Sequence, residues 1–198
     1  MKRFKAAALL FCLALCCALT ACSGTRRIYK SDLAVCLPEL VEQSKVLNEI
    51  YFGDGFPPRG DATLPGNGYY YVDGEVYGFE SIEQIKEATE QVFTPEYSVI
   101  LYAAAFDGVV GEDGAVSLPR YAEGELGLMQ YMGATVYDLA DRSYDFETLK
   151  IKKASRNRAT VSIETTDAHG GSATVELIVV RTVDEEGVEY YRLDSPTY

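Results

Sequence analysis

The cysteines and the one histidine are the side chains of this sequence that combine nucleophile or base chemistry with the binding of soft metals. A Ser-His-Asp or Cys-His device needs an imidazole that a third group holds rigidly. His169 instead stands in Asp-Ala-His-Gly-Gly-Ser, where the glycines indicate a turn. We interpret His169 as a turn residue and expect no catalytic triad.

The cysteines are concentrated at the start of the chain, where Cys12, Cys16 and Cys17 lie in an apolar run from Ala6 to Leu19. This run follows a basic start that contains Lys2, Arg3 and Lys5. A charged segment followed by a short apolar segment is typical of a signal peptide, and the apolar run is too short to span a bilayer comfortably.

The apolar run ends in Leu19-Thr20-Ala21-Cys22. This ending resembles the bacterial lipoprotein box. The resemblance implies that residues 1–21 are a signal peptide that is removed, and that Cys22 becomes the N-terminus and carries acyl chains such as palmitate. The chain would then be lipid-anchored at the outer face of the bacterial cytoplasmic membrane, with residues 22–30 as lipidated cysteine and tether. Several acyl chains hold a protein at a membrane stably, whereas one holds it weakly.

Assigning the signal peptide leaves Cys36 as the one cysteine outside the signal and the lipid site, so we expect no disulfide within the mature chain. A lone cysteine on an apolar helical pattern is usually a small buried hydrophobic residue. A zinc site needs several Cys or His ligands, and only Cys36 and His169 remain. The acidic residues are numerous enough for a paired-acid glycosidase. Loop carboxylates could also hold calcium, although their spacing matches no EF-hand loop. We interpret them as a solvated face and expect no metal or cofactor.

The net charge becomes more negative when the signal is removed. The full chain has 18 basic and 30 acidic residues, and loss of Lys2, Arg3 and Lys5 changes the net charge from -12 to -15. Nucleic acid repels such a chain, so we expect no nucleic-acid partner and membrane association through the lipid.

Basic residues nevertheless gather at one place in the second half of the chain: Lys150, Lys152, Lys153, Arg156 and Arg158. Alternation would place Lys150 and Lys152 on the same face of a strand. A local positive surface can bind an anionic polymer or an acidic partner. It can equally be a solubilising edge that deters strand pairing. We take Lys152, Lys153, Arg156 and Arg158 as candidate binding residues.

Tyrosine is abundant, with 15 copies, whereas tryptophan is absent. Tyr69, Tyr70 and Tyr71 precede Asp73-Gly74, and Tyr77 follows it; Asp-Gly predicts a two-residue hairpin turn. Such a hairpin places rings on both faces, and an exposed tyrosine can contact a partner or a sugar ring. Packing of these rings on the core is the open alternative.

The elements that must position these residues are helices first and strands afterwards. Apolar spacing, a capping box of Ser81 and Gln84, and Thr94-Pro95 as a helix start predict helices over 31–51, 81–92 and 96–105. We expect Pro38 to mark the first turn of the first helix. Alternation and turn residues predict strands over 118–121, 133–137, 148–154, 159–165, 173–183 and 188–193. This order predicts an α+β fold in which residues 31–198 form one domain, with helices packed on a curved antiparallel sheet.

Phe93-Thr94-Pro95-Glu96-Tyr97 at a helix junction and the ending Asp194-Ser195-Pro196-Thr197-Tyr198 complete this pattern. With the element order, they resemble the NTF2-like or cystatin-like lipoproteins of Gram-positive bacteria, and among them the IseA-type inhibitors of cell-wall DL-endopeptidases. The resemblance implies a cone-shaped domain and assigns no inhibitory residue. We therefore expect a non-enzymatic binding module whose partner is a cell-wall hydrolase or wall ligand. The alternative is an NTF2-like enzyme or small-ligand carrier with a carboxylate- and tyrosine-lined cavity.

Overall fold

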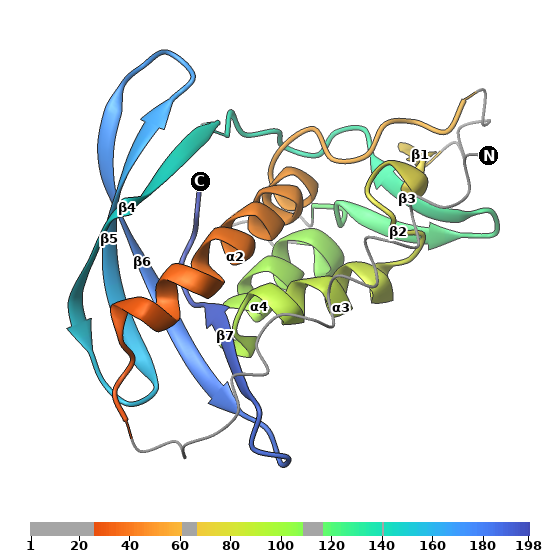
Figure 1. Ribbon diagram of the computed structural model, residues 1–198. Helices are drawn as coiled ribbons and strands as arrows, with labels where there is room; N and C mark the ends of the chain where they lie inside the picture. Colours follow the sequence, from red (N-terminus) through yellow and green to blue (C-terminus); the bar gives the residue numbers. More distant parts are fainter. Residues whose placement is uncertain (1–25, 61–66, 109–116, 140) are drawn as a thin grey trace, which may run out of the picture. The chain divides into compact units, whose positions relative to one another are not determined.

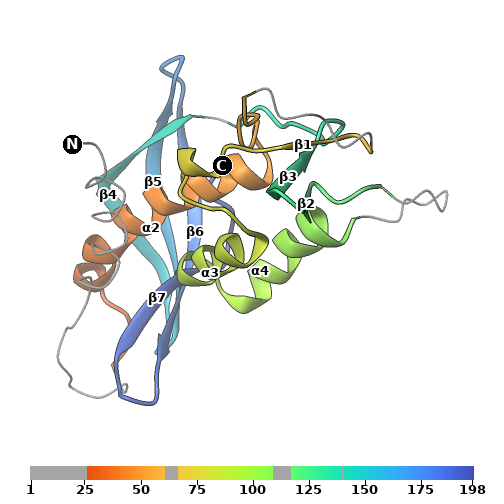
Figure 2. The same cartoon turned by 90° about the vertical axis from the view of Figure 1, so that its right-hand side faces the viewer.

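The computed structural model describes residues 26–60, 67–108, 117–139 and 141–198 (Figures 1 and 2). Within these ranges the chain forms three α-helices and two antiparallel sheets, which confirms the α+β class. The strands divide between the two sheets, where sequence analysis expected one curved sheet. The chain likewise divides into two compact units. The described part of the first contains residues 26–42 and 142–196, and the second contains residues 43–141 and 197–198 with the gaps given above.

Helix α2 (Lys30–Tyr51) begins in the first unit and ends in the second. Its buried apolar residues recur at intervals of three and four, as in Leu33, Leu37, Leu40 and Val41, which is the stripe of an amphipathic helix. Pro38 lies inside this helix, so its expected place in the first turn was wrong. Proline cannot donate the backbone hydrogen bond of its position. Burial of the apolar stripe on both sides of Pro38 explains why the helix continues through it.

The sheet of the first unit has the order β4 (Arg142–Ala154), β5 (Arg158–Asp167), β6 (Ser172–Val183) and β7 (Glu189–Leu193). All neighbours are antiparallel, and the four strands predicted over this region are confirmed. Val161 lies opposite Leu177, and Val179 lies opposite Leu193, so these side chains share one face. All four are buried and belong to the core of this unit.

Two hairpin turns of this sheet are built in the same way, one starting at Asp167 and one at Asp184. In each, the aspartate Oδ1 accepts the backbone N–H groups of the residues two and four positions later, at 2.8–3.0 Å. The glycine three positions later, Gly170 or Gly187, has a φ of 81° or 84°, which favours glycine. The expected turns are therefore confirmed, and the aspartate is their organising side chain.

The second unit contains α3 (Ile82–Val92), α4 (Pro95–Tyr102) and a π-helical continuation of α4 (Ala103–Asp107). Ser81 Oγ accepts the N–H of Gln84, and Thr94 Oγ1 accepts the N–H of Tyr97. Both predicted helix starts are confirmed, because each side chain accepts one of the N–H groups that an α-helix leaves unpaired at its start.

The small sheet of the second unit differs from the expectation. Its order is β1 (Tyr69–Tyr71), β3 (Gly127–Tyr131) and β2 (Tyr121–Gly124), so β1 pairs with a strand far along the chain and the predicted local hairpin is wrong. Asp73 instead accepts the N–H of Glu75 and starts a short 3-10 turn, Gly74–Val76. Residues 133–137, expected as a strand, form none, and the hairpin turn lies at Glu125-Leu126.

The Asp184 turn predicts a specific dependence of stability on pH. Backbone N–H groups and the Tyr190 hydroxyl stabilise the carboxylate and lower the pKa of Asp184 from its ordinary value of 3.8. A lowered pKa contributes stability above pH 3.8, and this contribution is lost as the pH falls through the folded-state pKa. We expect Asp184→Asn to lower the melting temperature at pH 7 and to lose this difference from the parent by pH 2–3.

Thermal unfolding followed by circular dichroism at several pH values measures this effect. Glu185→Gln, which removes a neighbouring charge, serves as the control, since no described hydrogen bond uses its carboxylate. A difference between parent and Asp184→Asn that stays constant from pH 7 to pH 2 would contradict the account.

Candidate binding surfaces

Arg181 organises the start of the first unit, and sequence analysis did not single it out. Its side chain is 1% exposed. Its Nη2 donates to the carbonyl oxygens of Arg26 and Arg156, each at 2.5 Å, and its Nη1 lies 3.4 Å from Glu189 Oε1. One buried guanidinium therefore connects the segment before α2, the turn between β4 and β5, and strand β7.

The segment before α2 is bound to the first unit by further contacts. Ile28 is fully buried, and its N–H donates to Ser155 O at 3.0 Å. Arg26 Nη2 lies 3.1 Å from the carboxylate of Asp32, which also accepts the N–H of Tyr29 at the start of α2. Residues 26–30, predicted as part of the tether, are thus attached to the folded unit. Cys22 lies outside the described residues.

The four candidate basic residues have different environments. Lys152 pairs with Glu176, and Arg158 Nη1 lies 2.6 Å from Asp194 Oδ2. Lys153 and Arg156 are exposed, and neither side chain has an ion pair within the described ranges. Lys153 and Arg156 therefore remain available to bind a partner, whereas ion pairs balance the charges of Lys152 and Arg158.

A bulge in β4 places three of the lysines on one face of the sheet. Lys150 is opposite Ser162 and Ile151 opposite Val161, but Thr160 is opposite Lys153, so Lys152 is the extra residue. Lys152 pairs with Glu176, and both Glu176 and Lys150 lie opposite Ser162, so Lys150 and Lys152 share a face as predicted. The bulge adds Lys153 to that face. Val161 belongs to the buried face, which places Lys150 and Lys153 together on the opposite face.

The tyrosine candidates contribute to the second unit itself. Tyr69 is buried, and its hydroxyl donates to Pro119 O at 2.6 Å. Tyr70 donates to Phe56 O at 3.1 Å, and the Tyr77 ring contacts the Phe56 ring edge-on at 5.2 Å. Burial raises the pKa of Tyr69, Tyr70 and Tyr77 above the ordinary value. Tyr70, Tyr71 and Tyr77 are partly exposed, so they keep surface for a partner, whereas Tyr69 is a core residue.

The second unit has a buried cation of its own, Arg120. Its Nε donates to Ile50 O at 2.9 Å and its Nη1 to Thr135 O at 2.8 Å, while its Nη2 donates to Gly53 O. The hydroxyl of Tyr121 donates to the same Ile50 carbonyl at 2.6 Å. Burial raises the pKa of Tyr121, so this hydroxyl stays protonated as a donor. Arg120 and Tyr121 together satisfy the Ile50 carbonyl, which α2 leaves unpaired at its end, and Arg120 also binds the Gly53 carbonyl just after the helix.

The residues weighed for catalysis and metal binding lie apart. His169 is exposed in the turn between β5 and β6, while Cys36 is buried in α2 with its Sγ 3.9 Å from Leu33 O. Over the described ranges, the structure brings together no group of three or more His, Cys, Asp or Glu side chains that could hold a metal ion. Within the same residues, no helix has the length and apolar character needed to cross a membrane.

Comparison with known proteins adds no relative: no family model matches the chain, and a search of curated proteins found no significant match.

The hydrogen bonds of the Arg120 side chain lead us to expect a large loss of stability when this residue is replaced. Arg120→Leu would leave the carbonyls of Ile50, Gly53 and Thr135 without this donor, and we expect it to lower the free energy of unfolding by about 3 kcal/mol. Arg59→Leu is the matched control, because Arg59 is exposed and donates to one carbonyl, Leu126 O.

Urea unfolding followed by circular dichroism measures both variants. We expect Arg59→Leu to remain within about 1 kcal/mol of the parent. Equal losses in the two variants would show that Arg120 has no special role at the end of α2.

Proposed function

We propose that this chain is a lipid-anchored binding module on the outer face of the bacterial cytoplasmic membrane, attached through Cys22. The observation that carries this proposal is the order of a basic start, an apolar run and Leu19-Thr20-Ala21-Cys22. The attachment of Arg26 and Ile28 to the first unit supports it, because both residues lie after the proposed lipid site. Cleavage before Cys22 would therefore remove the leader and keep these contacts.

A cell-wall hydrolase of the DL-endopeptidase type is the partner that we propose, on the basis of the IseA-type resemblance. Tyr70, Tyr71 and Tyr77, which are partly exposed in the second unit, are the candidate contacts for this partner.

Binding without catalysis also agrees with how the buried tyrosines are used. An enzyme or carrier of the alternative kind needs tyrosine hydroxyls that face a ligand. The hydroxyl of Tyr51 instead lies 2.9 Å from Thr89 Oγ1, and that of Tyr121 donates to Ile50 O. Burial raises the pKa of both, which keeps them protonated and unsuited to act as bases.

Lipidation is tested by expressing the full chain in a bacterium and analysing the membrane fraction. We expect the parent to lose residues 1–21 and to gain the mass of the acyl chains on the N-terminal peptide that starts at Cys22. Cys22→Ala should abolish the added mass, because it removes the thiol that carries the acyl chains.

Cys36→Ala is the matched control and should keep both the lipid and the membrane fraction, since Cys36 is buried in α2. An unmodified Cys22 in the parent, or cleavage elsewhere, would reject the proposed anchor.

The partner is tested with a purified DL-endopeptidase and purified peptidoglycan. We expect the chain to slow peptide release, and Tyr71→Ser/Tyr77→Ser to weaken this effect about tenfold, because the exposed rings that would contact the enzyme are lost. Lys153→Glu/Arg156→Glu is the control in the first unit and should leave the inhibition unchanged. Unchanged peptide release at saturating concentrations of the chain would exclude inhibition of that enzyme.

A further inference from the structure

The distance between the proposed lipid and the folded unit is short. Arg26 is the first described residue, and its carbonyl is already bound by the buried side chain of Arg181. Four residue steps separate Cys22 from Arg26, so the chain between them spans at most about 14 Å even when fully extended. A lipid at Cys22 would therefore keep the start of the first unit close to the headgroup layer of the membrane.

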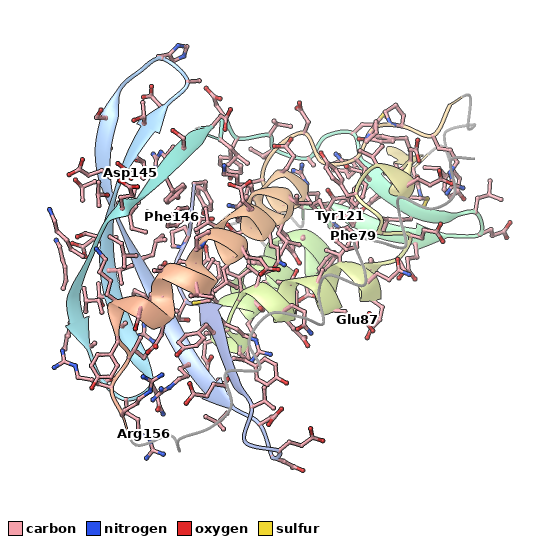
Figure 3. The ribbon with its side chains drawn as sticks, viewed as in Figure 1. Phe79, Glu87, Tyr121, Asp145, Phe146 and Arg156 are labelled. Carbon is pink, nitrogen blue, oxygen red and sulfur yellow. The ribbon has the colours of Figure 1, made fainter. Side chains whose placement is uncertain are left out.

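The same contacts bring basic residues from two distant segments to this place. Two carbonyl oxygens, of Arg26 and Arg156, lie 2.5 Å from the same Arg181 nitrogen, so at most about 5 Å separates them. Arg27 follows Arg26, and Lys153 precedes the turn that carries Arg156. All four side chains are exposed. Figure 3 shows Arg156 at the tip of the turn between β4 and β5.

An exposed aromatic ring accompanies these cations. Tyr29 is 46% exposed, and the guanidinium of Arg26 lies 5.5 Å from the centre of its ring. Tyrosine side chains are enriched at the boundary between membrane and water, because the ring is apolar and the hydroxyl is polar. We call Arg26, Arg27, Tyr29, Lys153 and Arg156 the basic end of the first unit.

The same end of the sheet also carries acidic residues, in the half formed by β6 and β7. The turn between β6 and β7 lies at the same end of the strands and carries Asp184, Glu185 and Glu186, all exposed. Two strand spacings, or about 10 Å, separate the two turns across the sheet. The N–H of Arg181 donates to Asn157 O, so the acidic turn, which starts at Asp184, also reaches about 10 Å further along the strands than the β4–β5 turn. Arg26 is paired with Asp32, so part of its charge is already balanced. The charge distribution favours contact of an anionic surface with the β4–β5 side of this end.

We propose that the basic end of the first unit binds the headgroups of anionic phospholipids once Cys22 is anchored in the bilayer. This inference rests on the proposed lipid at Cys22, which supplies the short connection. Cationic and tyrosine side chains then meet lipid phosphates, while the acidic turn tilts away from them. The turn between β5 and β6, about 34 Å along the ten residues of β5, points away from the membrane.

Tryptophan fluorescence tests this orientation, because the sequence contains no tryptophan. The chain from Cys22 to Tyr198 is coupled through the Cys22 thiol to a maleimide phospholipid in vesicles; Cys36 is buried and does not compete. Asn157→Trp reports on the basic end, and Ala168→Trp reports on the opposite turn of the same sheet. A phospholipid with a nitroxide on its headgroup quenches whichever tryptophan lies at the bilayer surface.

In vesicles with 30% phosphatidylglycerol, we expect quenching at position 157 to exceed quenching at position 168 about twofold. The excess should shrink in 0.5 M KCl, which screens charges beyond a few ångströms, and in pure phosphatidylcholine. Arg27→Gln/Lys153→Gln/Arg156→Gln should remove most of the excess, whereas Arg142→Gln should keep it. Unfolding curves equal to that of the parent confirm that each variant is folded.

Equal quenching at the two positions would overturn the proposal. An excess at position 157 that is unchanged in 0.5 M KCl and in the triple variant would also overturn it, since the short connection alone would then set the orientation. Chemical coupling makes the result independent of lipidation in the cell. If Cys22 is lipidated in cells but the quenching assay shows no excess at position 157, only the membrane contact of the basic end is rejected. If the quenching assay shows the excess but Cys22 is not lipidated in cells, only the lipid anchor is rejected.

Discussion

Buried guanidinium groups that bind backbone carbonyls are the interaction on which the rest of this structure depends. Arg181 in the first unit and Arg120 in the second each collect carbonyl oxygens from segments far apart in the sequence. Arginine keeps its charge at every accessible pH and presents five donors, so its burial stabilises a fold only when carbonyl or carboxylate groups meet those donors. At the end of α2 the carbonyls also carry the negative end of the helix dipole, which favours the charge of Arg120.

These two arginines secure opposite ends of the same helix. Arg181 binds the carbonyl of Arg26, whose own side chain pairs with Asp32 in the first turn of α2. Arg120 binds the carbonyls of Ile50 and Gly53, where α2 ends. Arg181 is imperfectly satisfied, since its buried Nε has no hydrogen-bond partner among the described residues. The two carbonyl bonds at 2.5 Å and the nearby carboxylate of Glu189 offset that loss.

Local signals predicted a large part of this fold. The four strands from β4 to β7 followed from alternation and turn residues, and the starts of α3 and α4 followed from Ser81, Thr94 and Pro95. Each of these signals acts within a few residues of its effect. The partner of the strand Tyr69–Tyr71 was wrongly predicted, because the true partner Gly127–Tyr131 lies far along the chain and no nearby pattern identifies that pairing.

The candidate binding residues also show the difference between local signals and long-range contacts. The lipoprotein box is a linear motif, so sequence alone carries that prediction, which the described residues do not reach. The pairing of Lys152 and Arg158 depends on neighbouring strands, so the run of cations overstated the free positive charge. One overlooked signal was available: the inward series Leu177, Val179, Arg181 places a charged residue at a core position of an apolar strand. A buried arginine in such a series indicates that carbonyl or acidic groups from other segments meet there.

The position of Arg181 also bears on how an acidic chain can stay at an anionic surface. The mature chain would carry a net charge of -15, which opposes approach to phospholipid, and one acyl chain by itself holds a protein only weakly. Stable attachment needs a second contribution, and either further acylation or a basic patch supplies it. By binding the carbonyls of Arg26 and Arg156 at once, Arg181 joins the point of attachment to the exposed cations of the β4–β5 turn. A negative total charge is therefore compatible with a membrane-facing basic end, because screening restricts each headgroup's interaction to charges within about 10 Å.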